Sequence, residues 1–353
     1  MVSTCKCPNC DAPIEFDSSL QKMTCEYCGN EMTIAEAEEQ LENYKVEFKD
    51  KTENVEEMID LEVYVCDTCG AEIMTDEHTS ATFCSYCGNP TLIRNRFEGV
   101  LAPGYVIPFK IDKEGAKTAY KSWVNKGGYF TPKEFKSEAI LEKITGLYAP
   151  YWLFDCTGSA VIKASARSIR TTREGQYRCT YTSYYDVFRD FSIGYDKLPV
   201  DASQKLPDYK MDLLEPFNYN EMVPFKLPYL SGYYADKYSL TSDDLRIRVN
   251  NRLEDYIITA GRNTITGYQS VSIVSKNINV TKDKADYVLL PVWVLSYRYK
   301  GTLHMFLMNG QTGKIVAERP KSSSLMWKWF FGIAGGIFAA LMAFGLLFGI
   351  IVI

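Results

Sequence analysis

The hexapeptide CEYCGN at residues 25–30 recurs almost unchanged as CSYCGN at residues 84–89, and it decides how the first part of the chain folds. Eight cysteines form two sets of identical spacing, C-x2-C, 14 residues and C-x2-C, and each member of the second set lies 59 residues after its counterpart. This repeat indicates an internal duplication. The two sets are Cys7, Cys10, Cys25 and Cys28, then Cys66, Cys69, Cys84 and Cys87.

The spacing of each set suits a four-coordinate metal site. Two cysteines that flank two residues present both sulfurs to one ion, and two such knuckles supply the tetrahedral thiolates that Zn²⁺ accepts. The segments between the knuckles read as short hairpins, so residues 1–32 and 63–97 are each predicted to form a small zinc ribbon with four cysteine ligands. Because four-thiolate sites are closed, the two predicted zinc ions are structural. Redox pairs and iron–sulfur clusters are the weaker alternatives.

The remaining cysteines and the first histidine receive structural interpretations. The first residues contain no apolar stretch of the kind that a signal peptide needs, so we expect a reducing cytosolic environment that favours metal binding over disulfides. Cys5 is read as a flexible terminal thiol, with a spare ligand as the alternative. Cys156 and Cys179 are predicted to be buried apolar side chains. His78 is predicted to lie on the surface.

An acidic segment at residues 33–62 separates the two cysteine sets. Residues 31–62 carry twelve acidic and three basic side chains, whereas the net charge of the later part, residues 98–353, is positive. Apolar residues recur at helical spacing from Ile34 to Tyr44, and Thr33 with Glu36 forms a capping box. We therefore expect an acidic helical connector. Nucleic-acid binding by this part is disfavoured, since phosphate binding needs clustered Lys and Arg.

Residues 98–320 are predicted to form one α+β cytosolic domain with mainly antiparallel sheet. Helices are expected at 131–135 and 240–261, and three successive strands within 287–316. The phrase Pro-Tyr-Trp-Leu at 150–153 resembles Pro-Val-Trp-Val at 291–294, which hints at a second duplication. No nucleotide-binding loop, nucleophile elbow or metalloprotease motif occurs, and the chain has two histidines. The chain is therefore not predicted to be an enzyme.

A series of four arginines lies near strand-like segments of this domain. It could face anionic lipid headgroups, nucleic acid or water, and the proximity of a membrane anchor makes the lipid surface plausible. The four are Arg167, Arg170, Arg173 and Arg178.

The C-terminal residues predict a membrane anchor at 327–353. Residues 329–353 contain no charged or strongly polar side chain, and a helix of this length crosses a hydrocarbon core of about 30 Å. Lys321 and Lys328 precede the run and no charge follows it, so the positive-inside rule predicts a single-pass cell-membrane protein with its N-terminal bulk in the cytoplasm. Small-residue pairs that allow helix self-association are Gly332 with Gly336 and Gly345 with Gly349.

The arrangement as a whole resembles a known protein family. CPNC and TCEYCGN resemble the zinc ribbon of the general transcription factor TFIIB. Two ribbons, a PYW/PVW-containing domain and one C-terminal helix together resemble Gram-positive bacterial membrane proteins described as TFIIB-type zinc-ribbon-containing. The resemblance implies partners similar to phage-shock protein A and to SPFH (band 7) proteins, and recruitment of those proteins to the membrane under envelope stress.

The leading functional prediction is a membrane-anchored zinc-ribbon adapter that recruits cytosolic proteins to the cell membrane. The alternative is a membrane-tethered zinc-ribbon protein that binds nucleic acid. An enzyme acting on lipid or protein has no support in the residues beyond the size of the middle domain.

Overall fold

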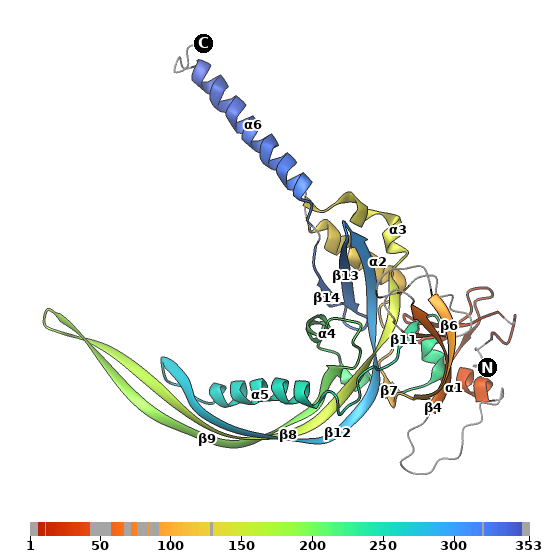
Figure 1. Cartoon of the computed structure of the whole chain (residues 1–353), viewed down its shortest axis with the longest axis horizontal. Coiled ribbons are helices and arrows are strands. Elements are labelled where there is room, and N and C mark those ends of the chain that lie inside the picture. Colours follow the sequence, from red (N-terminus) through yellow and green to blue (C-terminus); the bar gives the residue numbers. More distant parts are fainter. Residues whose placement is uncertain are drawn as a thin grey trace.

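The computed structural model of the chain describes residues 6–10, 12–42, 58–66, 72–75, 84, 86, 92–127, 130–319 and 321–347. A body built around one large sheet carries a long curved β arm on one side and a single long helix that extends from the end of the body (Figure 1). The small N-terminal sheet lies against the body on the side away from the arm.

The helices fall into short elements of the body and two long ones. The α-helices are α1 (Ile34–Glu42), α2 (Lys113–Asn125), α3 (Glu138–Leu141), α4 (Asp208–Leu214), α5 (Arg246–Asn263) and α6 (Ser323–Leu347). The 3₁₀ turns among the described residues are η2 (Lys133–Lys136), η3 (Tyr219–Glu221) and η4 (Leu227–Leu230).

The strands form two sheets. The small sheet has the order β1-β2-β3, and its strands are β1 (Glu15–Asp17), β2 (Lys22–Thr24) and β3 (Glu31–Met32). The strands of the large sheet are β4 (Met58–Cys66), β5 (Glu72–Thr75), β6 (Leu92–Leu101), β7 (Tyr105–Val106), β8 (Thr145–Glu174), β9 (Tyr177–Asp201), β10 (Val223–Pro224), β11 (Tyr234–Asp236), β12 (Ser270–Tyr299), β13 (Thr302–Asn309) and β14 (Ile315–Ala317).

The large sheet is mostly antiparallel, as predicted. Its path is β10-β7-β12-β8-β11-β5-β4-β6, with β9 paired to β8, β13 to β12 and β14 to β13. Within the part of the chain that the structure describes, parallel pairing is confined to two short contacts, β11 with β8 and β12 with β7. Strand β6 runs across the predicted boundary at 97/98, and β4 begins within the predicted connector, so the segment with the second cysteine set shares the sheet of the body.

The arm consists of the outer parts of β8, β9 and β12. Strand β12 begins at Ser270 opposite Arg167, so beyond that point β8 and β9 continue as a two-stranded hairpin that turns at Gly175 with a φ of +63°. We call residues 167–184 the arm tip. Register shifts at Phe154/Cys156 and at Lys282/Lys284 interrupt the ladders, and such bulges bend a strand. The arm therefore curves.

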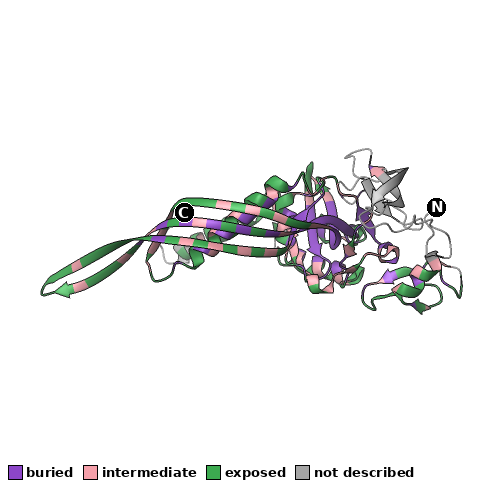
Figure 2. Cartoon of the chain, turned by 90° about the horizontal axis from the view of Figure 1, so that it is seen from below, coloured by how far each residue is buried: buried purple, intermediate pink, exposed green. Residues whose placement is uncertain are grey.

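Helix α5 lies along one face of the arm and makes close contact with it (Figures 1 and 2). A Cβ at Gly158 of β8 would lie 2.4 Å from Ile257 Cδ1, and a Cβ at Gly261 would lie 2.6 Å from Ile162 Cδ1. The glycines thus let helix and strand approach. The buried side of the helix repeats every four residues and comprises Val249, Leu253, Ile257 and Gly261.

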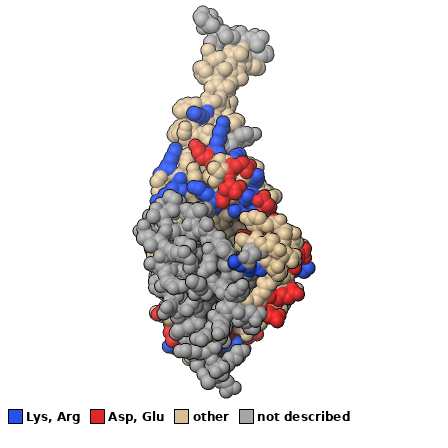
Figure 3. Space-filling model, turned by 90° about the vertical axis from the view of Figure 1, so that its right-hand side faces the viewer, with Lys and Arg blue, Asp and Glu red and all other residues tan. Residues whose placement is uncertain are grey.

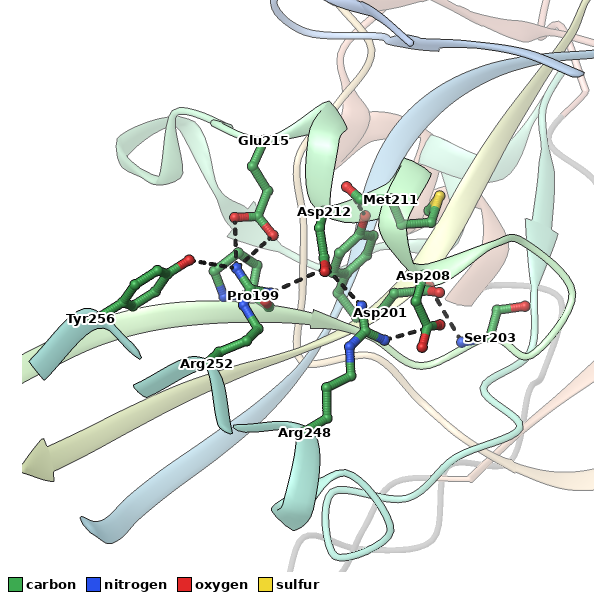
Figure 4. A network of polar contacts seen from close by, with 11 residues as sticks. Pro199, Asp201, Ser203, Asp208, Met211, Asp212, Glu215, Arg248, Arg252 and Tyr256 are labelled. Atoms are coloured by element: carbon green, nitrogen blue, oxygen red, sulfur yellow. Dashed lines mark hydrogen bonds and ion pairs between the residues drawn. The ribbon is translucent and has the colours of Figure 1, made fainter. Parts of the chain in front are cut away.

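A polar network fixes the first half of α5 to the body (Figure 4). Arg252 donates to the Pro199 carbonyl at 2.7 Å, to Asp212 at 3.2 Å and to Glu215 at 3.1 Å. Arg248 reaches Asp212 at 2.6 Å from the same helix. Since the two guanidiniums face carboxylates of α4 and of the loop that follows it, the network joins α5, α4 and the root of β9.

Aromatic side chains fill the core at the centre of the body. The Phe109 ring stacks on Tyr233 at a centroid distance of 4.3 Å and meets Tyr148 and Trp293 edge to face at 4.9 and 5.1 Å. The two similar phrases of the sequence lie on the adjacent strands β8 and β12, where Trp152 is opposite Tyr287 and Trp293 is opposite Gly146. They therefore contribute to one core.

Several local predictions are confirmed. Thr33 and Glu36 form the reciprocal hydrogen bonds of a capping box at 3.2 and 2.7 Å. The predicted strands within 287–316 are present, and Lys300 and Gly301 turn with φ of 50° and 82°. Cys156 is buried at 2% exposure.

Other local predictions are wrong in detail. Helix α5 begins at Arg246 rather than 240, because Thr241 and Asp244 form a capped turn first, and it continues past Gly261, which packs against the arm instead of ending the helix. Residues 133–136 form only a 3₁₀ turn without a side-chain cap. Cys179 is half-buried in the two-stranded arm tip, where no second layer covers it. Cys5 and His78 lie outside the described residues.

Candidate metal centre

Four cysteines of the first set come together at one end of the small sheet. The Sγ atoms of Cys7, Cys10, Cys25 and Cys28 all lie within 4.8 Å of one another. Cys7 and Cys25 are buried, whereas Cys10 and Cys28 are exposed. The predicted hairpin between the knuckles is present as β1 and β2, with Phe16 opposite Met23.

Backbone hydrogen bonds shape each knuckle. The Cys7 amide donates to the Ala12 carbonyl at 2.8 Å, and the Cys25 amide donates to the Asn30 carbonyl at 2.9 Å. The Gly29 amide donates to the Cys25 carbonyl at 2.9 Å, with Gly29 at a φ of +71°. The glycine of CEYCGN therefore supplies the left-handed residue that closes the second knuckle.

The cluster fits a single four-thiolate ion. Bonds of about 2.3 Å to a tetrahedral Zn²⁺ separate the sulfurs by roughly 3.8 Å. The sulfur pairs Cys7–Cys28 and Cys10–Cys25 lie 3.4 and 3.5 Å apart, close to that separation. The four cysteines can therefore hold a metal ion, and the donor set of four thiolates favours zinc or iron.

The electrostatics of the cluster also favour a cation. Although burial opposes ionisation of Cys7, backbone hydrogen bonds at Asn9 and Cys10 and the neighbouring Cys28 thiol lower the pKa of Cys7 to about 7. At Cys10 a backbone hydrogen bond from Ala12 is outweighed by the neighbouring thiols, which raise its pKa to about 12. Four thiolates so close together repel one another, and a bound dication removes that repulsion.

The small sheet is attached to the body beside the centre. The Phe16 ring meets the Tyr229 ring edge to face at a centroid distance of 5.3 Å. The backbone amide of Phe16 donates to the Ser231 carbonyl at 3.3 Å. The Gln21 side chain donates to the Phe109 carbonyl at 2.7 Å. Lys226 forms an ion pair with Glu38 of α1. The first cysteine module thus packs on η4 and the core instead of hanging free.

Half of the second cysteine set can be placed. Cys66 at the end of β4 and Cys84 are both fully buried, whereas Cys69 and Cys87 lie outside the described residues. A second metal site therefore stays a prediction. The knuckle residue Tyr86 is buried as well. Burial, together with the nearby Asp236 carboxyl, raises the pKa of the Tyr86 hydroxyl well above its usual range.

A buried acidic pair beside Tyr86 was not predicted from the sequence. Asp201 at the end of β9 and Asp236 at the end of β11 are 0% and 1% exposed. Ser203 donates to Asp236 at 2.6 Å, and its amide donates to Asp201 at 3.3 Å. Burial raises the pKa of both carboxyls, to about 6 for Asp236. A single acidic residue at the end of a strand carries no signal of burial in the sequence, so only the sheet topology reveals the pair.

Helix α6 is the candidate membrane span. Within the described residues, Ser323–Phe344 is long and apolar enough to cross a membrane, with a mean hydropathy of 1.5 and no part of it buried against the body. Ser322 fixes its first turn, donating its amide to the Phe130 carbonyl at 3.0 Å. Arg319 packs over the Trp123 ring just before it. Lys and Arg side chains, with acidic side chains among them, gather on the body around the base of α6 (Figure 3).

Gly332 and Gly336 lie one turn apart on this helix, and a Cβ at either would meet nothing within 4 Å. Gly345 also lies in α6, and Gly349 is outside the described residues. Self-association through these pairs stays a prediction.

Comparison with known proteins gives one informative match. No family model matches the chain, and no solved structure matches it significantly, so the TFIIB-type resemblance stays a prediction. A protein of Bacillus subtilis (strain 168) with the name "Uncharacterized protein YdjG" is 40% identical over 349 residues, which cover 99% of each chain. Identity at this level over the full length of both chains shows common descent, and the chain therefore belongs to the same family as YdjG.

Proposed function

We propose that the chain is a membrane-anchored adapter whose cysteine modules bind a cytosolic protein and hold it at the cell membrane. The observation that carries the proposal is the cluster of four cysteines on a body that ends in a helix long and apolar enough to span a membrane. Because four thiolates fill a tetrahedral ion, the centre has no position for a substrate and serves to fold the module around it. Such a rigid small module is suited to docking.

The metal is proposed to be zinc, and the two cysteine modules are proposed to be zinc ribbons with one structural ion each. The four-sulfur donor set and the short hairpin between the knuckles support this at the first module. The identical spacing of the second set supports it there.

The partners are proposed from the family resemblance. Proteins similar to phage-shock protein A and to SPFH proteins would be recruited in an envelope-stress system. The orientation of the anchor supports a cytosolic partner, because basic residues such as Lys321 and Lys328 lie at the start of α6. Nucleic-acid binding by the cysteine modules is less well supported, since the first module and α1 are rich in acidic side chains.

Purification of the full-length protein from nuclease-treated membranes tests the proposal. We expect a stoichiometric protein partner that is lost when Cys10 becomes Ser, because the first module cannot fold without its ion. The matched control is Cys179→Ser, which removes a thiol that lies far from the centre and should keep the partner.

Two results would count against the adapter. One is a set of co-purifying proteins that is identical for wild type and Cys10→Ser. The other is the absence of any protein partner together with nucleic acid in a sample that has not been treated with nuclease.

A further inference from the structure

The arm tip, residues 167–184, carries a concentration of exposed arginine and tyrosine side chains. It contains four arginines and one acidic residue, Glu174, and all four arginines are exposed. Among the described residues, none of the four forms an ion pair, while the Tyr181 hydroxyl donates to Glu174 at 2.9 Å. The exposed tyrosines are Tyr177, Tyr181 and Tyr184, at 78%, 53% and 74% exposure.

The strand register places the arginines where they repel one another. Arg173 lies directly opposite Arg178, and on the same face Arg167 lies opposite Tyr184. Like charges at directly opposed positions of an antiparallel pair destabilise it. A nearby anion would remove this repulsion, and the hairpin as it stands offers none on that face.

The direction of the anchor brings a membrane to this tip. Helix α6 leans over the arm: its far end lies on the side toward which the arm extends in one view, and over the arm in the view turned by 90° (Figures 1 and 2). A membrane plane drawn perpendicular to α6 therefore runs from the base of α6 toward the outer part of the arm. The tip also bends toward the side on which α6 stands (Figure 1).

We propose that the arm tip binds the anionic headgroups of the membrane that holds α6. Tyrosine rings favour the headgroup level, because the ring is apolar and the hydroxyl is polar, and arginine forms charge-assisted hydrogen bonds with phosphate. A lipid surface fits better than a nucleic acid, since the anchor holds one beside the tip at all times. The proposal rests on α6 as an anchor and does not depend on the adapter function.

The test uses the full-length protein in vesicles of pure phosphatidylcholine or of an equimolar mixture with phosphatidylglycerol. A donor fluorophore is attached at Gln176→Cys, in a background in which Cys5 and Cys179 are serine, and an acceptor is carried on lipid headgroups. Energy transfer from tip to lipid is expected to be higher in the anionic vesicles. Replacing Arg170, Arg173 and Arg178 by glutamine is expected to abolish the difference, because each basic group changes binding to an anionic surface by about fivefold.

The control variant is Arg246→Gln, which removes an exposed arginine at the body end of α5 and should leave the energy transfer to lipid unchanged. The matched single variant at the tip, Arg178→Gln, should lower the transfer in the anionic vesicles. Equal transfer in both vesicles, or transfer that survives the triple substitution, would overturn the proposal. Charge-dependent binding of the tip to an added oligonucleotide, with no response to lipid composition, would overturn it in favour of nucleic acid.

Discussion

Cys7 and Cys25 are buried in the first module and Cys10 and Cys28 are exposed, yet the sulfurs of all four come together. An ion bound by all four would join the two knuckles across the end of a hairpin whose strands have only three residues each. Phe16, Met23 and Met32 are the buried apolar side chains of this sheet. So small a core cannot hold the module together by itself, and the proposed metal ion would supply most of its folding free energy.

Replacing Cys25 by Ser is predicted to lower the zinc content by one ion per chain and to unfold residues 6–42 locally. Three remaining thiolates leave the tetrahedral ion one ligand short. Zinc content by atomic absorption and proteolytic cutting of this segment are the measurements. Cys179→Ser is the control and should match wild type in both. Unchanged zinc content in Cys25→Ser would remove the first metal site.

Asp236→Asn is predicted to stabilise the protein at neutral pH. Burial raises the pKa of Asp236 from 3.8 to about 6, so the folded chain holds an extra proton between these values and its stability falls as pH rises through that window. Asparagine avoids the cost of the buried charge and still accepts a hydrogen bond from Ser203. The gain should approach roughly 3 kcal/mol above pH 7 and vanish below about pH 4.

Thermal unfolding in detergent across this range of pH measures the effect. A stability difference between the variant and wild type that does not change with pH would show that the buried carboxyl does not titrate as described.

At the scale of the element, α5 connects the body to the arm and supports the arm along one face. The buried face of α5 packs on β8 and β12, and Arg248 and Arg252 join its first half to α4. At the other end of the helix, Arg189 of β9 donates to the Thr264 hydroxyl at 2.9 Å and to the Thr264 carbonyl at 3.1 Å. An arginine is favourable at a helix C-terminus. Contacts at both ends of α5 thus fix the arm relative to the body.

Arg252→Ala is predicted to destabilise the protein by roughly 2–4 kcal/mol. The Glu215 carboxylate, 19% exposed, would lose its guanidinium partner, and the Pro199 carbonyl would lose its donor. The partial exposure of Asp212 keeps the cost below that of a fully buried pair. Arg246→Ala, on the exposed side of the same helix, should cost less than about 0.5 kcal/mol. Equal melting temperatures for the two variants would contradict the bracing role.

The short-range elements could be predicted from the sequence, and the arm could not. The capping box of α1 and the turn at Lys300–Gly301 depend on neighbouring residues, so their patterns are visible in the chain. The arm depends on pairing between β8 and β12, whose partners Arg167 and Ser270 lie far apart in sequence. Strands of 25 and 30 residues also exceed the usual length by several fold, so no pattern of ordinary strands anticipates them.

At the scale of the whole molecule, the body lies between the first cysteine module and the candidate membrane helix α6. The spacing of Cys7, Cys10, Cys25 and Cys28 was enough to predict that the first cysteine cluster would come together, because the knuckle geometry is local. The sequence could not show that the first module packs on η4 through Phe16, or that β4 and β5 join the large sheet. Both are contacts between distant segments, and they make the cysteine modules part of the body.

Removal of residues 322–353 is predicted to release the protein from membranes, since no other helix among the described residues is long and apolar enough to span one. The full-length protein should stay in the membrane pellet after an alkaline wash, and the truncated protein should appear in the supernatant. In right-side-out vesicles the residues before Ser322 should be protected from added protease. Cleavage of the body under these conditions would reverse the predicted orientation.

The central claim is that the metal-folded module holds a protein at the membrane, and the location of the partner tests it most directly. Once a stoichiometric partner is identified, its distribution between membrane and cytosolic fractions can be measured in cells with wild type, Cys10→Ser or the chain without residues 322–353. We predict a membrane-bound partner with wild type and a cytosolic partner with either variant. A partner that stays at the membrane with both variants would contradict the adapter function.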